Sequence, residues 1–389
     1  MTMSDFDLPA EYITASNDLR SDTFTTPTAE MVQAAMKSSI GDSVYKEDVD
    51  TVRLEQTVSQ LAGKEAGLFC VSGTLSNQVA LRTHLMQPPY SILCDYRAHV
   101  YTCESAGLAI LSQAMVIPVM PCNGSYLTVE DIASRFIPDD GDIHCAPTRV
   151  VSLEQTLNGI VTPYDELFRI SSWCRENGLL LHCDGARIWN ACVATGLALD
   201  RYCELFDSMS ICLSKSIGAP MGSILVGSKD FIKKANHFKK QQGGGIRQAG
   251  MMSRMALVAL NGDWKSRIQY SHDIASDFAQ FCIDNGVPLQ SSPDSSFIFL
   301  DLQKAKMDPK ILVENGIKYG VKLMGARIAF HYQISQETLR SVKLAVIDTF
   351  NYAKDHPYIA TFSNKIYNDT SAEKVNRIDS KLNGKTTST

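Results

Sequence analysis

The 389-residue sequence predicts an α/β fold, with a mostly parallel seven-stranded sheet that contains one antiparallel strand, plus a small C-terminal α+β domain. Between about Gly67 and Gly227, short apolar runs alternate with helical patterns, which is typical of a parallel sheet with crossover helices. The connection between Leu213 and Ser223 is too short for a crossover helix, so the last strand is expected to run antiparallel to its predecessor. After about residue 270 the regular alternation ends, and this change predicts the second domain.

The predicted strands of the sheet are rich in Val, Ile, Leu and Cys, as strands buried on both faces are. They cover Gly67–Ser72, Ser91–Asp95, Met115–Pro118, Arg149–Glu154, Leu179–Asp184, Ser208–Leu213 and Ser223–Val226. A connecting helix is predicted over Pro163–Asn177, because proline suits a first helical turn and Gly178 suits a C-terminal stop. Its apolar residues between Leu167 and Cys174 fall on one stripe.

Four segments are predicted along the chain. They are an N-terminal extension (1–17), a large ligand-binding domain (18–270), a small domain (271–358) and a mobile polar tail (359–389). The tail is rich in Asn, Ser, Thr and Lys and has few large apolar residues. Further helices are predicted at Met251–Leu260, Ser271–Gly286 and Ser335–Lys354, and strands at Ser296–Leu302 and Lys322–His331.

Composition and cysteine spacing indicate which binding partners, cellular location and metal sites to expect for the protein. A net charge of −5 argues against nucleic acid or an anionic membrane as a partner. The acidic N-terminus lacks the apolar core of a signal peptide, and no apolar run approaches membrane-spanning length. The eleven cysteines show no repeating spacing and are interpreted as reduced thiols of a cytoplasmic protein. His144-Cys145 and His182-Cys183 fit no zinc spacing, so no metal site is expected.

Polar residues follow five of the predicted strands, at the edge where open α/β sheets bind ligands. They are Ser72-Gly73-Thr74, Asp95 with His99, Glu154-Gln155-Thr156, Asp184-Gly185-Ala186-Arg187 and Ser214-Lys215. A purely structural protein has little reason to adopt this layout. No GxGxxG or GxxxxGK[ST] follows a strand, so neither a dinucleotide fold nor a P-loop is supported.

Each of three motifs at this edge has a plain structural alternative. The turn Ser72-Gly73-Thr74 could bind a phosphate at a helix start, or only cap that helix. Asp184 could pair with a protonated pyridine nitrogen, or cap a helix or pair with Arg187. Lys215, among small and apolar residues, could be a nucleophilic amine, or a lysine that extends from a strand end. Their order along the chain favours a site for pyridoxal 5′-phosphate (PLP).

Five strings carry a resemblance to a known family. They are LRSDTFTTPT at Leu19–Thr28, GKEAGLFCVSGTLSNQ at Gly63–Gln78, LHCDGARIWNA at Leu181–Ala191, ICLSKSIGAPMGS at Ile211–Ser223 and KKQQGGGIRQAG at Lys239–Gly250. Over about residues 18–352 the chain resembles the low-specificity L-threonine aldolases, most of all their fungal branch, which are PLP enzymes of the aspartate-aminotransferase fold (fold type I). The resemblance implies a cytoplasmic homotetrameric lyase of amino-acid metabolism that cleaves L-threonine and L-allo-threonine to glycine and acetaldehyde by a retro-aldol reaction.

The resemblance also implies roles at the cofactor. Lys215 would hold PLP as a Schiff base and give way to the substrate amine, Asp184 would pair with the pyridinium nitrogen, and His99 would stack on the ring. Arg247 would help bind the phosphate from a neighbouring subunit. The implied cofactor-binding residues are Ser72, Gly73, Thr74, His99, Asp184, Arg187, Lys215 and Arg247.

At the substrate, the resemblance implies that Ser21, Arg187 and Arg327 bind the carboxylate, which a guanidinium can meet with two hydrogen bonds. Tyr45 and Glu104 complete the implied substrate site. The implied catalytic residues are Lys215, His99 and His144, and either histidine could accept the hydroxyl proton, directly or through water. For His99 a stacking or orienting role is favoured, and His182 and His331 are interpreted as structural.

Two departures from the family pattern bear on substrate preference and on stereospecificity at Cβ. Lys46 stands where the family commonly has glycine, and it would be strained if the loop needs a glycine conformation. The family's Glu-Asn-Thr is Glu154-Gln155-Thr156, and Leu157 stands where many bacterial members have histidine. Two alternatives stay open: another fold type I PLP reaction, such as β-elimination or transamination, and a non-catalytic PLP-binding protein.

Overall fold

The computed structural model describes residues 15–359, which fall into two compact units. The sheet unit comprises residues 25–269, and the C-terminal unit comprises residues 15–24 and 270–359. The predicted domain boundaries stay a prediction, and this division differs from them by grouping residues 18–24 with the C-terminal residues. Of the predicted polar tail, residues 360–389 lie outside the described residues.

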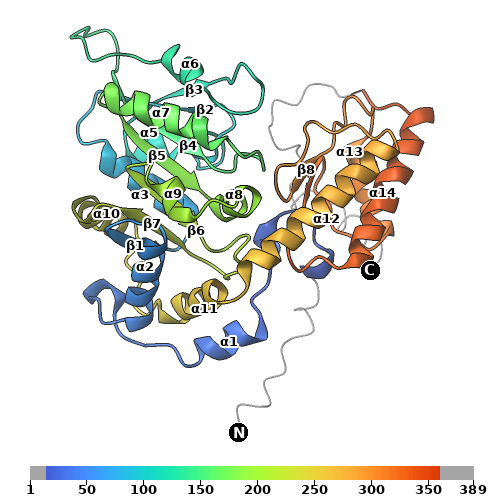
Figure 1. The fold of residues 1–389 in the computed structure, drawn as a ribbon, viewed down its shortest axis with the longest axis horizontal. Coiled ribbons are helices and arrows are strands. Elements are labelled where there is room, and N and C mark those ends of the chain that lie inside the picture. Colours follow the sequence, from blue (N-terminus) through green and yellow to red (C-terminus); the bar gives the residue numbers. More distant parts are fainter. Residues whose placement is uncertain (1–14, 360–389) are drawn as a thin grey trace, which may run out of the picture. The chain divides into compact units, whose positions relative to one another are not determined.

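The sheet unit is built on seven strands in the order β1-β7-β6-β5-β4-β2-β3 (Figure 1). Their bounds are β1 (Ala66–Cys70), β2 (Ser91–Asp95), β3 (Met115–Val119), β4 (Thr148–Glu154), β5 (Leu180–Gly185), β6 (Ser208–Cys212) and β7 (Ser223–Gly227). In this sheet β7 runs antiparallel to both of its neighbours, β1 and β6, and the other adjacent strands pair in parallel. The prediction of a mostly parallel sheet with one antiparallel strand is confirmed.

Helices cover both faces of this sheet. One face packs on α2 (Val49–Leu61), α7 (Tyr164–Glu176), α8 (Ile188–Thr195), α9 (Leu199–Cys203) and α11 (Gly250–Asn261). The other face packs on α3 (Gly73–His84), α5 (Gly107–Leu111) and α10 (Lys229–Gln241). Three more helices complete the unit: α1 (Ala29–Ala35), α4 (His99–Thr102) and α6 (Val129–Ala133).

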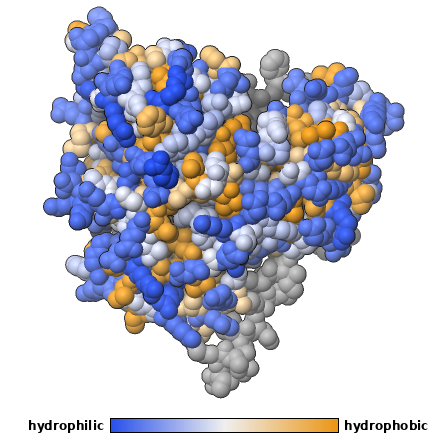
Figure 2. Space-filling view, in the orientation of Figure 1, coloured by the Kyte–Doolittle hydropathy of each residue, from blue (hydrophilic) through white to orange (hydrophobic). Residues whose placement is uncertain are grey.

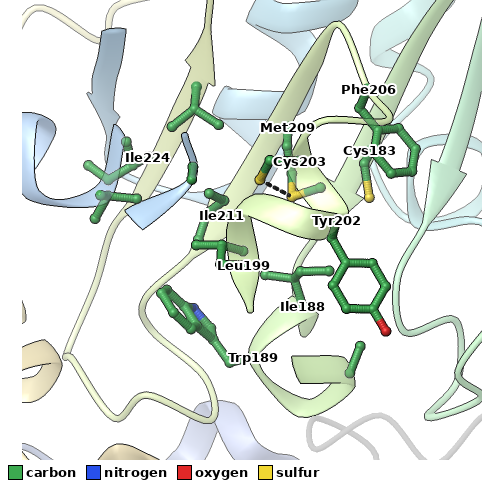
Figure 3. Close-up of a cluster of buried hydrophobic side chains, with 14 of the residues drawn as sticks. Cys183, Ile188, Trp189, Leu199, Tyr202, Cys203, Phe206, Met209, Ile211 and Ile224 are labelled. Atoms are coloured by element: carbon green, nitrogen blue, oxygen red, sulfur yellow. Dashed lines mark hydrogen bonds between the residues drawn. The ribbon is translucent and has the colours of Figure 1, made fainter. Parts of the chain in front are cut away.

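Side chains alternate between these two faces along β5. Leu181 and Cys183 enter the core beneath α8 and α9, which Figure 3 shows around Trp189, Tyr202 and Met209. In that core the thiol of Cys203 lies 3.5 Å from the sulfur of Met209. Because successive strand residues point to opposite faces, His182 and Asp184 face the α3 side instead. This alternation brings polar side chains of β5 under α3.

The C-terminal unit contains α12 (Trp264–Asp284) from residue 270 onward, α13 (Pro309–Lys318), α14 (Gln336–Asp355) and a two-stranded antiparallel sheet of β8 (Phe297–Phe299) and β9 (Arg327–Ala329). Its core includes Phe278, Ile328 and Phe330. Both strands are shorter than predicted, because outlying residues pair only through isolated bridges such as Leu289 with Leu300. Helix α12 begins seven residues before the predicted helix start at Ser271.

Hydrophilic and hydrophobic side chains intermix on the protein face shown in Figure 2. Among residues 15–359, no helix combines the length and the apolar character needed to cross a lipid bilayer.

Candidate active site

The strand-end residues meet at one edge of the sheet unit. Glu154 ends β4 and stands directly beside Asp184 near the end of β5 in the parallel register. Lys215 follows the neighbouring strand β6, and His99 begins α4 just after β2. The strand order β6-β5-β4-β2 therefore brings the predicted lysine, aspartate and histidine to the same carboxyl edge.

Asp184 is buried and firmly held. One carboxylate oxygen accepts a hydrogen bond from the side-chain amide of Asn77 at 2.8 Å, and the other accepts from the backbone N–H of Ala186 at 3.0 Å. The same amide of Asn77 donates to Glu104 at 2.9 Å, and Nδ1 of His99 lies 2.8 Å from that carboxylate. Ligand atoms of His99, Glu104 and Asp184 all lie within 4.8 Å of one another.

Gln78 completes the surroundings of Glu104. Its amide donates to Oε2 of Glu104 at 2.6 Å. The close approach depends on Gly107, since a Cβ at that position would lie 2.6 Å from the amide of Gln78. The buried Glu104 side chain thus accepts hydrogen bonds from two amides and pairs with one imidazole. These partners offset the free-energy cost of burying a carboxylate.

Two groups at this edge have shifted pKa values. The hydrogen bond to the Glu104 carboxylate is the main reason that the pKa of His99 is raised. Burial, reinforced by the negative charge of Asp184, raises the pKa of the Glu154 carboxyl. Oε2 of Glu154 accepts a hydrogen bond from the backbone N–H of His99 at 2.8 Å, so it also fixes where α4 begins.

Lys215 differs from the other charged residues of this edge. With residues 15–359 its ammonium group forms no hydrogen bond or ion pair, whereas its backbone carbonyl accepts from Gly218 at 2.8 Å. The hydroxyl of Thr156, just after β4, is buried and has no hydrogen-bond partner within the described chain. At this one sheet edge, an amine without a hydrogen bond, a firmly held carboxylate and a spare hydroxyl form a donor set that fits PLP.

The turn before α3 fits the phosphate of that cofactor. Ser72 caps α3 by accepting from the N–H of Leu75 at 3.1 Å. The N–H groups of Gly73 and Thr74 belong to the first turn of the helix and have no intrahelical acceptor. A Cβ at Gly73 would meet no atom within 4 Å, so the space over the turn is open. Helix starts of this kind bind phosphate groups.

Within the sheet unit, no hydrogen bond or ion pair of the described residues joins Tyr45, Arg247 or His144 to this cluster. Tyr45 is 72% exposed, and its loop is tied to that of Arg247, whose guanidinium pairs with Asp42 at 3.0 Å. Ser43 N–H also donates to the carbonyl of Arg247 at 2.7 Å.

His144 lies on an exposed loop. Its hydrogen bonds and ion pairs within residues 15–359 involve Asp142, whose carboxylate lies 3.7 Å from Nδ1. The structure therefore does not bring His144 to the carboxylates that surround His99.

The structure shows whether the loop at Lys46 needs a glycine backbone conformation. Lys46 has a φ of +63°, in the left-handed region that favours glycine. Its ammonium pairs with the buried carboxylate of Glu55 at 2.7 Å, and Glu55 also accepts from the N–H of Phe69 at 3.0 Å. The strain predicted for a non-glycine residue is therefore present, together with an ion pair that glycine could not make.

In the C-terminal unit, Ser21 and Arg327 lie close together. Nη2 of Arg327 donates to the carbonyl of Arg20 at 2.9 Å, next to the buried Ser21. The segment is held beside β9 because Ala329 N–H donates to the carbonyl of Leu19 at 2.9 Å. His331 is buried and lies 2.8 Å from the carbonyl of Asp18, as expected of a structural histidine.

The sequence did not single out Asn77 or Gln78. Both lie in the string GKEAGLFCVSGTLSNQ, one to two turns after the phosphate turn, and both are buried. The available signal was a pair of adjacent amides in a helix that must pack on a sheet, which is an uncommon place for them. The sequence places Glu154 at a strand end and predicts no role for it.

Comparison with known proteins identifies the family. A family model described as "Beta-eliminating lyase" matches residues 18–305. A low-specificity L-threonine aldolase of Saccharomyces cerevisiae is 66% identical, over 95% of this chain and 96% of its own. Proteins of the same description from Eremothecium gossypii and Candida albicans are 64% and 56% identical, over 96% and 90% of this chain and 98% and 94% of their own.

Solved structures show the same fold at lower identity. A structure titled as a Leishmania major threonine aldolase has a TM-score of 0.71 at 19% identity, covering 86% of this chain and 99% of that one. A putative L-allo-threonine aldolase of Listeria monocytogenes has a TM-score of 0.70 at 22% identity, covering 87% and 99%. With the sequence matches, these findings show that the chain belongs to the beta-eliminating lyase family and, within it, to the low-specificity L-threonine aldolases.

Proposed function

We propose that this chain cleaves L-threonine and L-allo-threonine to glycine and acetaldehyde, with PLP as its cofactor. The observation that carries this function is the unengaged Lys215 amine at the same sheet edge as the buried, doubly hydrogen-bonded Asp184 carboxylate. Bound PLP supplies an electron sink for the Cα–Cβ bond that breaks. The 66% identity to a low-specificity L-threonine aldolase supports the same reaction.

The cofactor is held, in this proposal, by residues of the sheet unit. Lys215 supplies the amine that binds it covalently, and Asp184 pairs with the ring nitrogen. Gly73 and Thr74 bind the phosphate with their free N–H groups, with Ser72 fixing the turn. Arg247 adds a charge to the phosphate site of a neighbouring subunit.

Substrate binding is assigned to charged and hydroxyl groups. Ser21, Arg187 and Arg327 bind the substrate carboxylate, and this contact sets which bond at Cα is broken. Tyr45 and Glu104 complete the substrate site, Glu104 through its pairing with His99.

The β-hydroxyl proton passes to His99 or His144, directly or through water. The raised pKa of His99 leaves more of this imidazole protonated near neutral pH, which favours a stacking and orienting role for it. His144, on its exposed loop, is then the proton acceptor to test first. A His144→Asn variant that lost activity with an unchanged KM would identify it, whereas full activity would return the role to His99 or to water.

We infer a cytoplasmic homotetramer that has neither nucleic acid nor membrane as a partner. Exposed apolar residues near the Tyr45 loop support assembly with a second copy of the chain. They are Met36 (54% exposed), Ile40 (81%), Val49 (67%) and Met251 (48%). The net charge of −5 supports the absence of an anionic partner.

The deciding assay offers L-threonine, L-allo-threonine and the two D-isomers to the purified protein. Glycine and acetaldehyde in equal amounts from the L-isomers are expected, with Lys215→Ala as the inactive control. 2-Oxobutanoate with ammonia as the main products would show that β-elimination is the reaction instead, and 3-hydroxy-2-oxobutanoate would show transamination.

A further inference from the structure

A row of buried polar side chains runs under α3 from the far end of the sheet to Asp184. We propose that Asn77, His182 and Ser208 are positioning residues, which hold the Asp184 carboxylate through a one-way chain of hydrogen bonds beginning at His84. This inference rests on the proposed function, because Asp184 matters to the reaction as the partner of the cofactor ring.

The chain is continuous. Nε2 of His84 lies 2.7 Å from Oγ of Ser208, and that hydroxyl lies 2.8 Å from Nδ1 of His182. Nε2 of His182 lies 3.3 Å from Oδ1 of Asn77, whose amide reaches Asp184 at 2.8 Å. His182 and Ser208 are direct partners in the register of β5 and β6, and His182 shares a sheet face with Asp184 because the two are separated by one residue.

The direction of the donors follows from the two carboxylates. Asn77 must present its NH₂ group to Asp184 and Glu104, because an amide oxygen would repel them. Its carbonyl oxygen then faces His182, so Nε2 of that ring must carry the proton.

The remaining links follow in turn. A neutral His182 with a proton on Nε2 accepts at Nδ1, so the Ser208 hydroxyl donates there. Having given its one hydrogen, Ser208 accepts from Nε2–H of His84. Every donor in the chain thus points towards Asp184.

Burial keeps the side chains of this hydrogen-bond chain uncharged. His182, Ser208 and Asn77 are each at most 1% exposed. Burial lowers the pKa of His182 to about 3 and that of His84 to about 4, so both rings are neutral at physiological pH. A neutral chain fixes orientation and does not add a charge that would compete with the cofactor for Asp184.

The outer end of the chain lies far from the reaction. His84 stacks on Phe231 with ring centres 4.6 Å apart, and both residues line a cavity of about 520 Å³ at the amino ends of β5 and β6. The proposed cofactor site lies at the opposite edge of the sheet. We therefore expect the functional effect of a substitution to decrease from Asn77 to His182 and then to His84.

The test compares two replacements of His182. Leucine removes the donor to Asn77, whereas glutamine keeps an amide donor near the position of Nε2. Without the His182 donor the Asn77 side chain is no longer fixed, so its hydrogen bond to Asp184 weakens. For His182→Leu we therefore expect kcat with L-threonine to fall about tenfold with KM nearly unchanged. The visible absorbance of the bound PLP should also titrate at a shifted pH, and His182→Gln should restore both properties.

A matched control separates positioning from stability. Ser76, also on α3, forms a buried hydrogen bond of 2.7 Å with Ser210 that is not part of the chain. Ser76→Ala should lower the melting temperature while kcat and the absorbance titration stay as in the wild type. If His182→Leu does not fold, Ser208→Ala tests the same link, because it lets His182 adopt the other tautomer.

Three outcomes would overturn the proposal. They are a His182→Leu or Ser208→Ala protein that is less stable but unchanged in kcat and titration, a His182→Gln protein as impaired as the leucine variant, and an absorbance shift in Ser76→Ala equal to that of His182→Leu. The absorbance titration needs no threonine. A wild-type protein that binds PLP but does not cleave threonine would therefore refute the function while leaving this inference testable.

Discussion

At the scale of single residues, the sheet edge is organised around Glu104, which pairs with His99 and accepts from two amides. Glu104→Gln should lower the pKa of His99, because the carboxylate is the main cause of its rise. A histidine whose pKa is raised by folding stabilises the protein below its unfolded value, and this contribution is lost as pH rises through the folded value. In denaturation of the PLP-free protein, the free energy of unfolding should therefore be lower for Glu104→Gln than for the wild type. This difference should be largest in acid and should shrink above neutral pH.

The control for this prediction is another carboxylate beside a histidine. His144 is 75% exposed and lies 3.7 Å from Asp142. Asp142→Asn should show no pH-dependent deficit, because solvent screens an exposed pair. If the loss of unfolding free energy in Glu104→Gln did not vary with pH, the pairing with His99 would not be its cause.

Gly107 offers a second prediction for a single residue. A Cβ at this position would lie 2.6 Å from the Gln78 amide, so Gly107→Ala should push Gln78 away from Glu104. We expect a loss of about 1–3 kcal/mol in the free energy of unfolding, with reduced kcat, since a buried charged acceptor loses a donor. Denaturant unfolding and steady-state kinetics would measure both.

Gly73 is the contrasting glycine. Its Cβ would meet nothing within 4 Å in the described chain. Gly73→Ala should therefore leave the stability of the PLP-free protein unchanged or slightly higher, yet weaken PLP binding, because a methyl group would enter the space over the phosphate turn. Equal losses of stability in Gly73→Ala and Gly107→Ala would contradict the different roles assigned to these two glycines.

At the scale of elements, the left-handed residue in the loop before α2 gives a prediction about backbone strain. Lys46→Ala removes the ion pair with Glu55 and keeps the strained conformation, whereas Lys46→Gly removes both. The glycine variant should be more stable than the alanine variant by about 1 kcal/mol, the usual penalty for a Cβ in this region. Equal stability of the two, measured by urea unfolding, would show that the loop relaxes.

Elements also show what sequence patterns could predict. Strand positions such as Ser91–Asp95 followed from apolar runs, and the short link from Leu213 to Ser223 gave the antiparallel direction of β7. The early start of α12 and the shortness of β8 and β9 depend on tertiary pairing, which leaves no local pattern.

The same limit applies to the site. Asp184 and Lys215 could be predicted because strand ends meet at one edge of a parallel sheet. The interpretation of His182 as merely structural missed its link to Asn77, since that contact joins residues 105 positions apart. Buried polar residues on α3 and β5 find their partners only when the helix packs on the sheet.

At the scale of the whole molecule, the proposed assembly makes Arg247 the most informative residue. Its guanidinium is half exposed and pairs with Asp42 of its own chain, and no hydrogen bond or ion pair within residues 15–359 links it to the phosphate turn. If Arg247 serves the phosphate of a neighbouring subunit, Lys215→Ala and Arg247→Ala disable different halves of each shared site. Subunits that carry these two changes should then complement each other.

The expected recovery can be calculated for pairwise shared sites. After a 1:1 mixture is dissociated and reassembled, half of the pairs are hybrids, and each hybrid has one site with both native residues. Activity should therefore rise from the low values of the separate variants to about a quarter of wild type. Lys215→Ala mixed with Asp184→Ala is the control, because both residues lie in one chain's sheet unit and no hybrid site is intact. Failure of the Arg247 mixture to recover activity, with a measured mass of four chains, would place Arg247 outside the phosphate site of its neighbour.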